Sequence, residues 1–235
     1  MVRNFMDTNK IVDVMDISSY PDILTKYLDT FSDRFIKYNS IENRDFFYDF
    51  GDNALNLIKD YDIVAYHYTK EIHDGYFKKN GLQCLSFEEH KNQVIRIVEN
   101  KLSAENMDKL QSLQCPNDVD NGKLHFVYTF DKADAGDLVR YFGGECIYGQ
   151  ITDGFCRNEI SDVLESTGTP VVVKFRINIG SVNSCSAIDT IISKYAKHYY
   201  NEDFSVVRRQ GFTAHNILPE QILQVIDIGL NNKLS

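Results

Sequence analysis

The sequence has few cysteines, and none of them is arranged for pairing. No Cys-x-x-Cys pair occurs, and no His/Cys combination has the spacing of a zinc finger. We therefore expect free thiols in a reducing compartment, and we expect no structural metal. The five cysteines are scattered and odd in number: Cys84, Cys115, Cys146, Cys156 and Cys185.

Long apolar runs are also missing. No run approaches the roughly 18 residues that a helix needs to cross a bilayer. The N-terminal stretch MVRNFMDTNKIVDVMD carries acids early and has no continuous apolar segment, so it does not look like a secretory signal. Together these absences predict a soluble protein of the cytosol with no membrane partner.

Glycine-rich nucleotide-binding motifs are absent as well. The chain contains neither Gly-x-Gly-x-x-Gly nor a P-loop. The glycines at Gly143, Gly144, Gly149 and Gly154 are explained more simply as helix caps and turns. A Rossmann dinucleotide site is therefore not expected.

The chain has fewer basic than acidic residues. The net charge is −9 and the sequence pI is about 5.1. An acidic surface repels phosphate backbones, which disfavours non-specific binding of nucleic acid. The pairs Arg208-Arg209 and Lys174/Arg176 are candidates for a local basic groove, although short basic pairs usually lie on a solvated face.

What is present has the composition of a globular protein, with 43% hydrophobic and 25% charged residues. Apolar residues recur at three- and four-residue spacing over residues 19–39, and a second helical stretch covers residues 44–60. From residue 62 strands and helices are mixed. We expect a helical N-terminal extension over residues 1–60 and one domain over residues 61–235.

The alternation of apolar residues predicts strands over 62–69, 124–130, 171–179, 204–212 and 221–229. Helices are expected over 70–79, ending at an Asn80-Gly81 C-cap, over 88–114 with an interruption near Leu102-Ser103, and over 132–142. Ser186 and Asp189 have the spacing of a capping box at the start of a further helix, which carries Ile188, Ile191, Ile192, Tyr195 and Tyr199. Strands and helices do not alternate regularly, which indicates an α+β fold.

The first candidate for chemistry is the strand Tyr66-His67-Tyr68-Thr69. Period-two geometry puts His67 and Thr69 on the same face, where they can offer hydrogen bonds to a ligand. The alternative is a half-buried histidine, with Thr69 serving only as the N-cap of the next helix.

Two tyrosines and an acidic pair complete the candidates. Tyr128 on a strand and Tyr141 at a helix end could stack on both sides of a planar ring, or they could be ordinary core aromatics. Glu202 and Asp203 precede a predicted strand, where a carboxylate could stabilise positive charge. The plainer interpretation of this pair is a solvated loop.

In this order, the features resemble the His-Tyr-Glu type of the ADP-ribosyltransferase superfamily, which includes the poly-ADP-ribose polymerases and bacterial toxins that modify nucleic acid. The Glu-x-Glu pair of the Arg-Ser-Glu branch is missing. The resemblance spans about residues 67–228 and implies a split β-sheet core. It is carried by His67-x-Thr69, Gly81-Leu82, Tyr128 with Tyr141, Tyr200-Asn201-Glu202, and Pro219 with Ile222 and Ile226.

The resemblance implies that NAD is the substrate. His67 and Thr69 would hold its nicotinamide ribose and carboxamide, and Tyr128 and Tyr141 would stack on nicotinamide. Glu202 would stabilise the positive charge that develops on the sugar, with no metal required.

The sequence departs from the family pattern at this acid. Asp203 separates Glu202 from the strand residue Phe204, so Asp203 is a second candidate for the working carboxylate. Glu145 is a third.

Two alternatives remain on the same fold: an NAD-dependent enzyme that removes an RNA 2′-phosphate, and a non-catalytic binding module. As a transferase, the chain fits a toxin or anti-phage defence effector that modifies a macromolecular acceptor, either protein or nucleic acid. An antitoxin or regulatory partner would suit that role.

Overall fold

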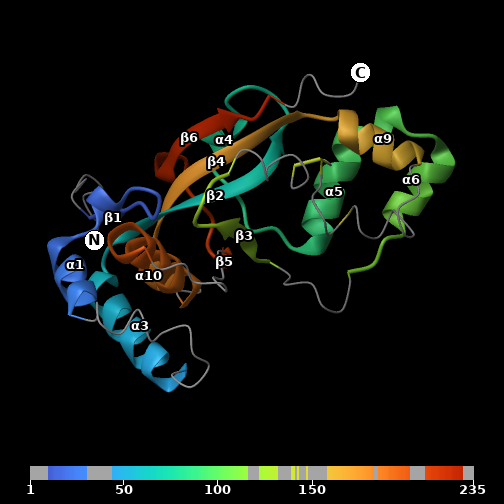
Figure 1. The fold of residues 1–235 in the computed structure, drawn as a ribbon. Coiled ribbons are helices and arrows are strands. Elements are labelled where there is room, and N and C mark those ends of the chain that lie inside the picture. The colour runs from blue at the N-terminus through green and yellow to red at the C-terminus, as the bar shows by residue number, and fades with distance from the viewer. Residues whose placement is uncertain are drawn as a thin grey trace, which may run out of the picture. The chain divides into compact units, whose positions relative to one another are not determined.

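The computed structural model describes residues 10–30, 44–115, 122–131, 139–140, 142, 147, 158–182, 185–201 and 210–229. Within these residues the protein is an α+β protein (Figure 1). The helices are α1 (Asp22–Asp29), α3 (Arg44–Ile58), α4 (Tyr76–Asn80), α5 (Phe87–Val98), α6 (Ala104–Gln111), α9 (Glu159–Ser166) and α10 (Cys185–Tyr200). The strands are β1 (Ile11–Val12), β2 (Asp62–Glu71), β3 (Leu124–Val127), β4 (Thr169–Asn178), β5 (Gln210–Thr213) and β6 (Ile222–Asp227).

The six described strands form one sheet with the order β5-β3-β2-β4-β6, and β1 pairs with β2 off this path. β1 runs parallel to the start of β2, and β3 runs antiparallel to it, with Tyr66 opposite Val127. The end of β4 lies beside the start of β2, since Ile179 N donates to Tyr61 O at 3.0 Å. β1 and β3 therefore share the other edge of β2.

The chain divides into two compact units, which are described separately. The first unit comprises Met1–Tyr66, His125–Phe130 and Phe175–Thr213, and the second comprises His67–Leu124, Asp131–Lys174 and Ala214–Ser235. Residues 1–60 thus share a unit with β3 and α10. The domain boundary predicted at residue 60 stays a prediction. No helix among the described residues is long and apolar enough to span a membrane.

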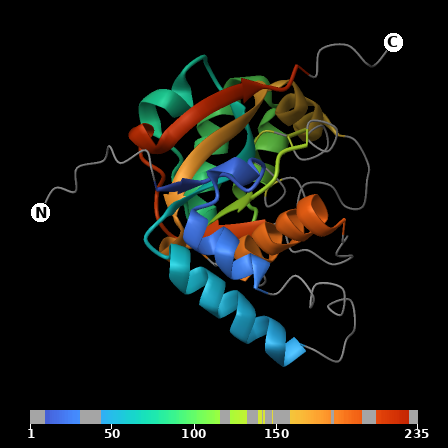
Figure 2. The same ribbon diagram turned by 60° about the vertical axis from the view of Figure 1, so that its left-hand side comes forward.

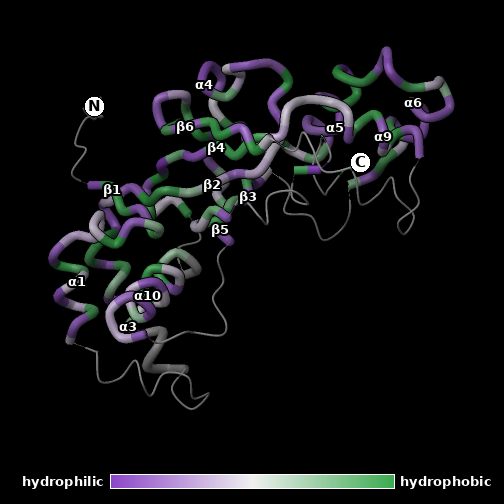
Figure 3. The backbone as a smooth tube through the Cα atoms, turned by 45° about the horizontal axis from the view of Figure 1, so that its top comes forward, coloured by the Kyte–Doolittle hydropathy of each residue, from purple (hydrophilic) through white to green (hydrophobic). Residues whose placement is uncertain are grey.

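In the first unit, α1 and α10 both pack on α3, and Figure 2 shows the three helices side by side. The rings of Tyr27 on α1 and Phe50 on α3 are stacked with centroids 5.2 Å apart. Along α1, hydrophobic and hydrophilic residues alternate within each turn (Figure 3), and Leu24 and Leu28 are fully buried. This amphipathic stripe is what places α1 against its neighbours.

In the second unit, α5, α6 and α9 enclose an apolar cluster. Its buried members include Val94 and Val98 from α5, Leu110 from α6 and Leu164 from α9. The break predicted near residue 102 is confirmed, because α5 ends at Val98, and the Ser103 hydroxyl caps α6 by accepting from Asn106 N. Leucine and valine at helical spacing made this part predictable.

One predicted helix boundary is wrong. Residues 70–79 were expected to be helical, whereas β2 continues to Glu71 and α4 begins only at Tyr76. Gly75, at φ 78°, is the N-cap of α4, so Thr69 does not cap it. The strand extends because Lys70 and Glu71 both find buried partners, which local propensity does not anticipate.

The predicted C-cap at Gly81 is confirmed. Gly81 N donates to Phe77 O, and Gly81 has φ 71° and ψ −163°, a region open essentially to glycine alone. A Cβ at this position would collide with the main-chain oxygen of Ile217.

We expect Gly81→Ala to lower the free energy of unfolding by more than about 2 kcal/mol, because it combines backbone strain with a backbone clash. Gly75→Ala is the matched control: Gly75 also has positive φ, but a Cβ there meets nothing within 4 Å. Its cost should be about 1 kcal/mol. Urea denaturation of both variants measures the difference, and equal costs would contradict this account of Gly81.

Candidate functional site

His67 and Thr69 lie on β2, which has strand partners on both edges. Both side chains are half-buried, and the two-residue period puts them on the same face of the strand. The prediction that these residues share a face is therefore confirmed. A half-buried position on a hydrogen-bonded strand fixes a side chain while leaving part of it accessible to a ligand.

The end of β2 is held by two charged side chains that are almost fully buried. Lys70 is 5% exposed and Glu71 is 6% exposed. Lys70 Nζ donates to Leu164 O at 3.4 Å and to Glu165 O, at the carboxyl end of α9. Glu71 Oε1 accepts from Phe77 N at 3.2 Å, in the first turn of α4. The ends of two helices thus pair with adjacent residues on opposite faces of the strand, which satisfies both buried charges.

Burial lowers the pKa of Lys70 to about 8, and the nearby charge of Glu165 opposes this shift. Gly168, at φ 74°, lies against the same strand end, and a Cβ there would come within 2.9 Å of Glu71 O. The segment between α9 and β4 is therefore closely packed on the residues that follow His67 and Thr69.

Two distant segments that contain predicted motifs are joined in the second unit. Leu82 and Ile217 form an isolated antiparallel bridge, with Leu82 N donating to Ile217 O at 2.9 Å and Ile217 N donating to Leu82 O at 2.8 Å. Cys84 N also donates to Asn216 Oδ1 at 2.7 Å. The Gly81-Leu82 turn that follows His67 is thus tied to the segment that leads into β6.

Tyr128 belongs to the first unit and follows β3 directly. Its side chain is 0% exposed, its ring meets Phe126 edge to face at 5.5 Å, and its hydroxyl lies against Gly211 of β5. Stacking on a ligand would require its neighbours to move. Tyr128 as a nicotinamide contact stays a prediction.

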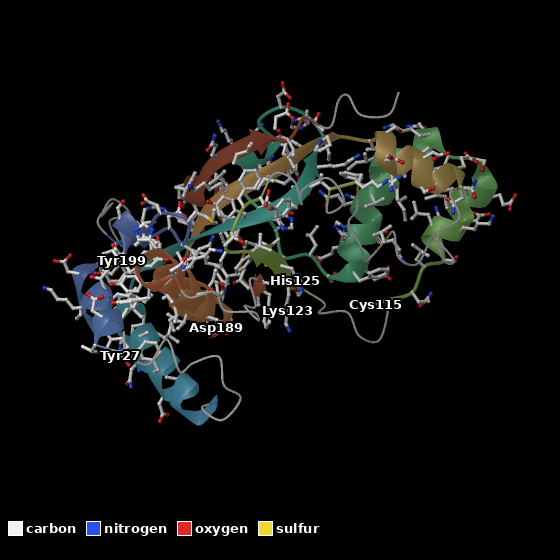
Figure 4. The ribbon with its side chains drawn as sticks, viewed as in Figure 1. Tyr27, Cys115, Lys123, His125, Asp189 and Tyr199 are labelled. Atoms are coloured by element: carbon white, nitrogen blue, oxygen red, sulfur yellow. The ribbon has the colours of Figure 1, made fainter. Side chains whose placement is uncertain are left out.

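The carboxyl end of α10 is anchored to α1. Tyr195 and Tyr200 both donate from their hydroxyls to Asp29 Oδ1, at 2.6 and 3.0 Å. Burial raises the pKa of Tyr195, and the hydrogen bond to Asp29 adds to the effect. Asn201 follows at φ 55°, a left-handed conformation that asparagine tolerates. The helix therefore ends at Tyr200, two residues before Glu202 in the sequence. Figure 4 labels Tyr27 and Tyr199 on these two helices.

The remaining predicted site residues are Tyr141, Glu145, Glu202 and Asp203, and they lie outside the described residues. The structure thus brings together His67 and Thr69 on one strand, and Leu82 with Ile217. No group of three or more metal-ligating His, Cys, Asp or Glu side chains occurs among the residues that the structure describes.

The sequence did not identify Lys70, Glu71 and Asp29 as residues that anchor the structure. An adjacent lysine and glutamate look like the solvated start of a helix, and nothing local marks them as buried. Asp29 lies at the end of an amphipathic helix, and its partners are far away in the sequence. The partners of Lys70 and Asp29 come from distant segments, whereas Glu71 pairs with Phe77, six residues further along the chain.

In comparisons with known proteins, no family model matches the chain, and neither a curated protein nor a solved structure matches it. The class that the structure itself defines is an α+β protein with a mixed sheet.

The lowered pKa of Lys70 makes stability depend on pH in a specific direction. Between about pH 8 and 10.5 the folded protein has lost this proton while the unfolded chain still holds it, so stability rises with pH across this window. Below about pH 8 both states are protonated, and the cost of burying the charge is constant. Relative to Lys70→Met, the wild type should therefore gain stability from pH 8 to 10.

Urea denaturation at several pH values measures this gain. Lys79→Met, at an exposed position on α4, is the control. Its free energy of unfolding should change with pH in the same way as that of the wild type. If the difference in unfolding free energy between the wild type and Lys70→Met does not change with pH, the lowered pKa of Lys70 is contradicted.

Proposed function

We propose that this chain is an NAD-dependent ADP-ribosyltransferase that transfers ADP-ribose to a macromolecular acceptor. The observation that carries the proposal is the Leu82–Ile217 bridge. It joins the opening and closing segments of the motif series in the unit that also contains His67 and Thr69. Segments that are distant in sequence and adjacent in space are what a shared ligand site requires.

In the proposed reaction, the bond between nicotinamide and the ribose C1′ breaks, and its electron pair leaves with nicotinamide. A nucleophile of the acceptor then attacks C1′ and loses a proton, so the transfer needs no oxidant or reductant. His67 and Thr69 would bind the nicotinamide ribose and carboxamide. Both side chains are half-buried on a strand whose end is fixed by Lys70 and Glu71, which supports a preorganised role for them.

The carboxylate in this proposal is Glu202 or Asp203, aided by Tyr128 and Tyr141 on the nicotinamide ring. A fixed negative charge beside C1′ stabilises the oxocarbenium-like transition state more than the ground state. The Asp29–Tyr195–Tyr200 contact supports this choice of segment over Glu145, because it holds the helix end that directly precedes Glu202.

The double variant Glu202→Gln with Asp203→Asn tests the chemistry. It removes the proposed charge but keeps similar side-chain size, so nicotinamide release should fall by roughly 10²–10³-fold while the protein still folds. Release of nicotinamide from labelled NAD is the measurement. Asp74→Asn with Glu99→Gln, two exposed acids elsewhere, makes the same change in net charge and should leave the rate unchanged.

Unchanged turnover in the double variant would remove both acids from the mechanism. A wild-type protein with no nicotinamide release in any lysate would favour the non-catalytic binding module. Separate digestion of labelled products with protease, DNase and RNase identifies the acceptor.

The proposed role as a toxin or anti-phage effector predicts a phenotype. Induced expression in a bacterial host should arrest growth, because ADP-ribosylation of a macromolecule inactivates it, and the double amide variant should not arrest growth. Growth curves measure the effect, and immunoblots show whether both proteins accumulate equally. Normal growth with abundant wild-type protein would rule out the toxin role.

A further inference from the structure

An open groove lies along α5 in the second unit, and Figure 1 shows the position of this helix. Its volume is about 280 Å³, near the lower end of the range for ligand sites, roughly 300–1,000 Å³. That size suits one nucleotide better than a dinucleotide. The lining side chains are Gln83, Leu85, Glu89, Asn92, Gln93 and Arg96.

The polar side chains come from one helix face. Glu89, Asn92, Gln93 and Arg96 follow the i, i+3, i+4, i+7 spacing that brings side chains into one stripe. Glu89 and Arg96 are seven residues apart, which is about 10 Å along the helix axis. The groove thus has a negative end and a positive end, with primary amides between them.

Several of these groups have unused hydrogen-bonding capacity. In the described part of the chain, the exposed side chains of Arg96, Asn92 and Gln83 form no hydrogen bond or ion pair with the protein. Arg96 is exposed, so its guanidinium is accessible to a ligand. Its guanidinium can bind a phosphate with two parallel hydrogen bonds.

The negative end is preorganised by the start of α5. Ser86 N and Ser86 Oγ both donate to Glu89 Oε2, at 2.8 and 2.7 Å. These bonds lower the pKa of Glu89, so its carboxylate is ionised at neutral pH. Both bonds end on Oε2, so Oε1 can still accept from a ligand, and an exocyclic amine of a base is a suitable donor.

We propose that this groove binds a nucleoside 5′-phosphate whose base carries an exocyclic amine. The linear order of the ligand matches that of the groove: the base amine lies at Glu89, Leu85 packs on the base, Asn92 and Gln83 bond to the base edge or ribose, and Arg96 holds the phosphate. The ligand is either a free mononucleotide or the adenylate half of NAD. The proposal does not depend on the transferase activity.

Isothermal titration calorimetry of the full chain with AMP tests the proposal. AMP should bind saturably, adenosine and UMP should bind more weakly, and inorganic phosphate should be weakest. Arg96→Gln should weaken AMP by roughly tenfold or more and adenosine by less than about twofold, since only AMP carries the phosphate. Asn92→Ala should weaken both AMP and adenosine.

The matched controls are Lys79→Gln, which makes the same charge change outside the groove, and Asn100→Ala, an exposed asparagine on the following turn. Both should bind AMP like the wild type. Thermal unfolding should show unchanged midpoints for all four variants. The Glu202→Gln with Asp203→Asn variant should also keep AMP binding, which separates this groove from the proposed transferase site.

Competition between NAD and AMP identifies the adenylate half of NAD as the ligand, and absence of competition identifies a free mononucleotide. The proposal is overturned if AMP shows no saturable binding, if inorganic phosphate binds as tightly as AMP, or if Arg96→Gln binds AMP normally.

Discussion

The burial of Lys70 and Glu71 at the end of β2 is the constraint on which the second unit depends. Two charged side chains next to each other in sequence are expensive to bury, and they are tolerated only where each has a polar partner. Lys70 finds the carboxyl end of α9, and Glu71 finds the first turn of α4. Adjacent strand residues point to opposite faces. These two contacts therefore hold one helix end on each face of the strand.

This constraint also fixes the candidate ligand-binding face. His67, Thr69 and Glu71 occupy every second position of β2, so their side chains lie on one face of the strand. The hydrogen bond from Phe77 N to Glu71 orders the segment that follows His67 and Thr69. α4 then ends at Gly81, whose unusual backbone conformation brings Leu82 against Ile217. One strand end, one short helix and one glycine thereby connect the segments that we propose to form part of the ligand site.

The first unit has a comparable anchor at the end of α10. Asp29 accepts hydrogen bonds from two tyrosines on the last two turns, and the left-handed Asn201 ends the helix. In the α5 groove, by contrast, the exposed side chains of Arg96, Asn92 and Gln83 have no partner in the described part of the chain. Because these three side chains are exposed, water hydrates them, and a ligand in the groove can replace that water.

The sequence alone determined the elements with strong periodicity. α3, the break between α5 and α6, the alternation of β4 and the glycine cap at Gly81 all follow from spacing and local backbone preference. The pairing of His67 with Thr69 on one face follows from the strand period. Tertiary structure decided the rest: the extension of β2 through Lys70 and Glu71, the full burial of Tyr128, and the Asp29 anchor. Lys70, Tyr128 and Asp29 all have partners in distant segments of the chain, and local sequence patterns carry no information about such contacts.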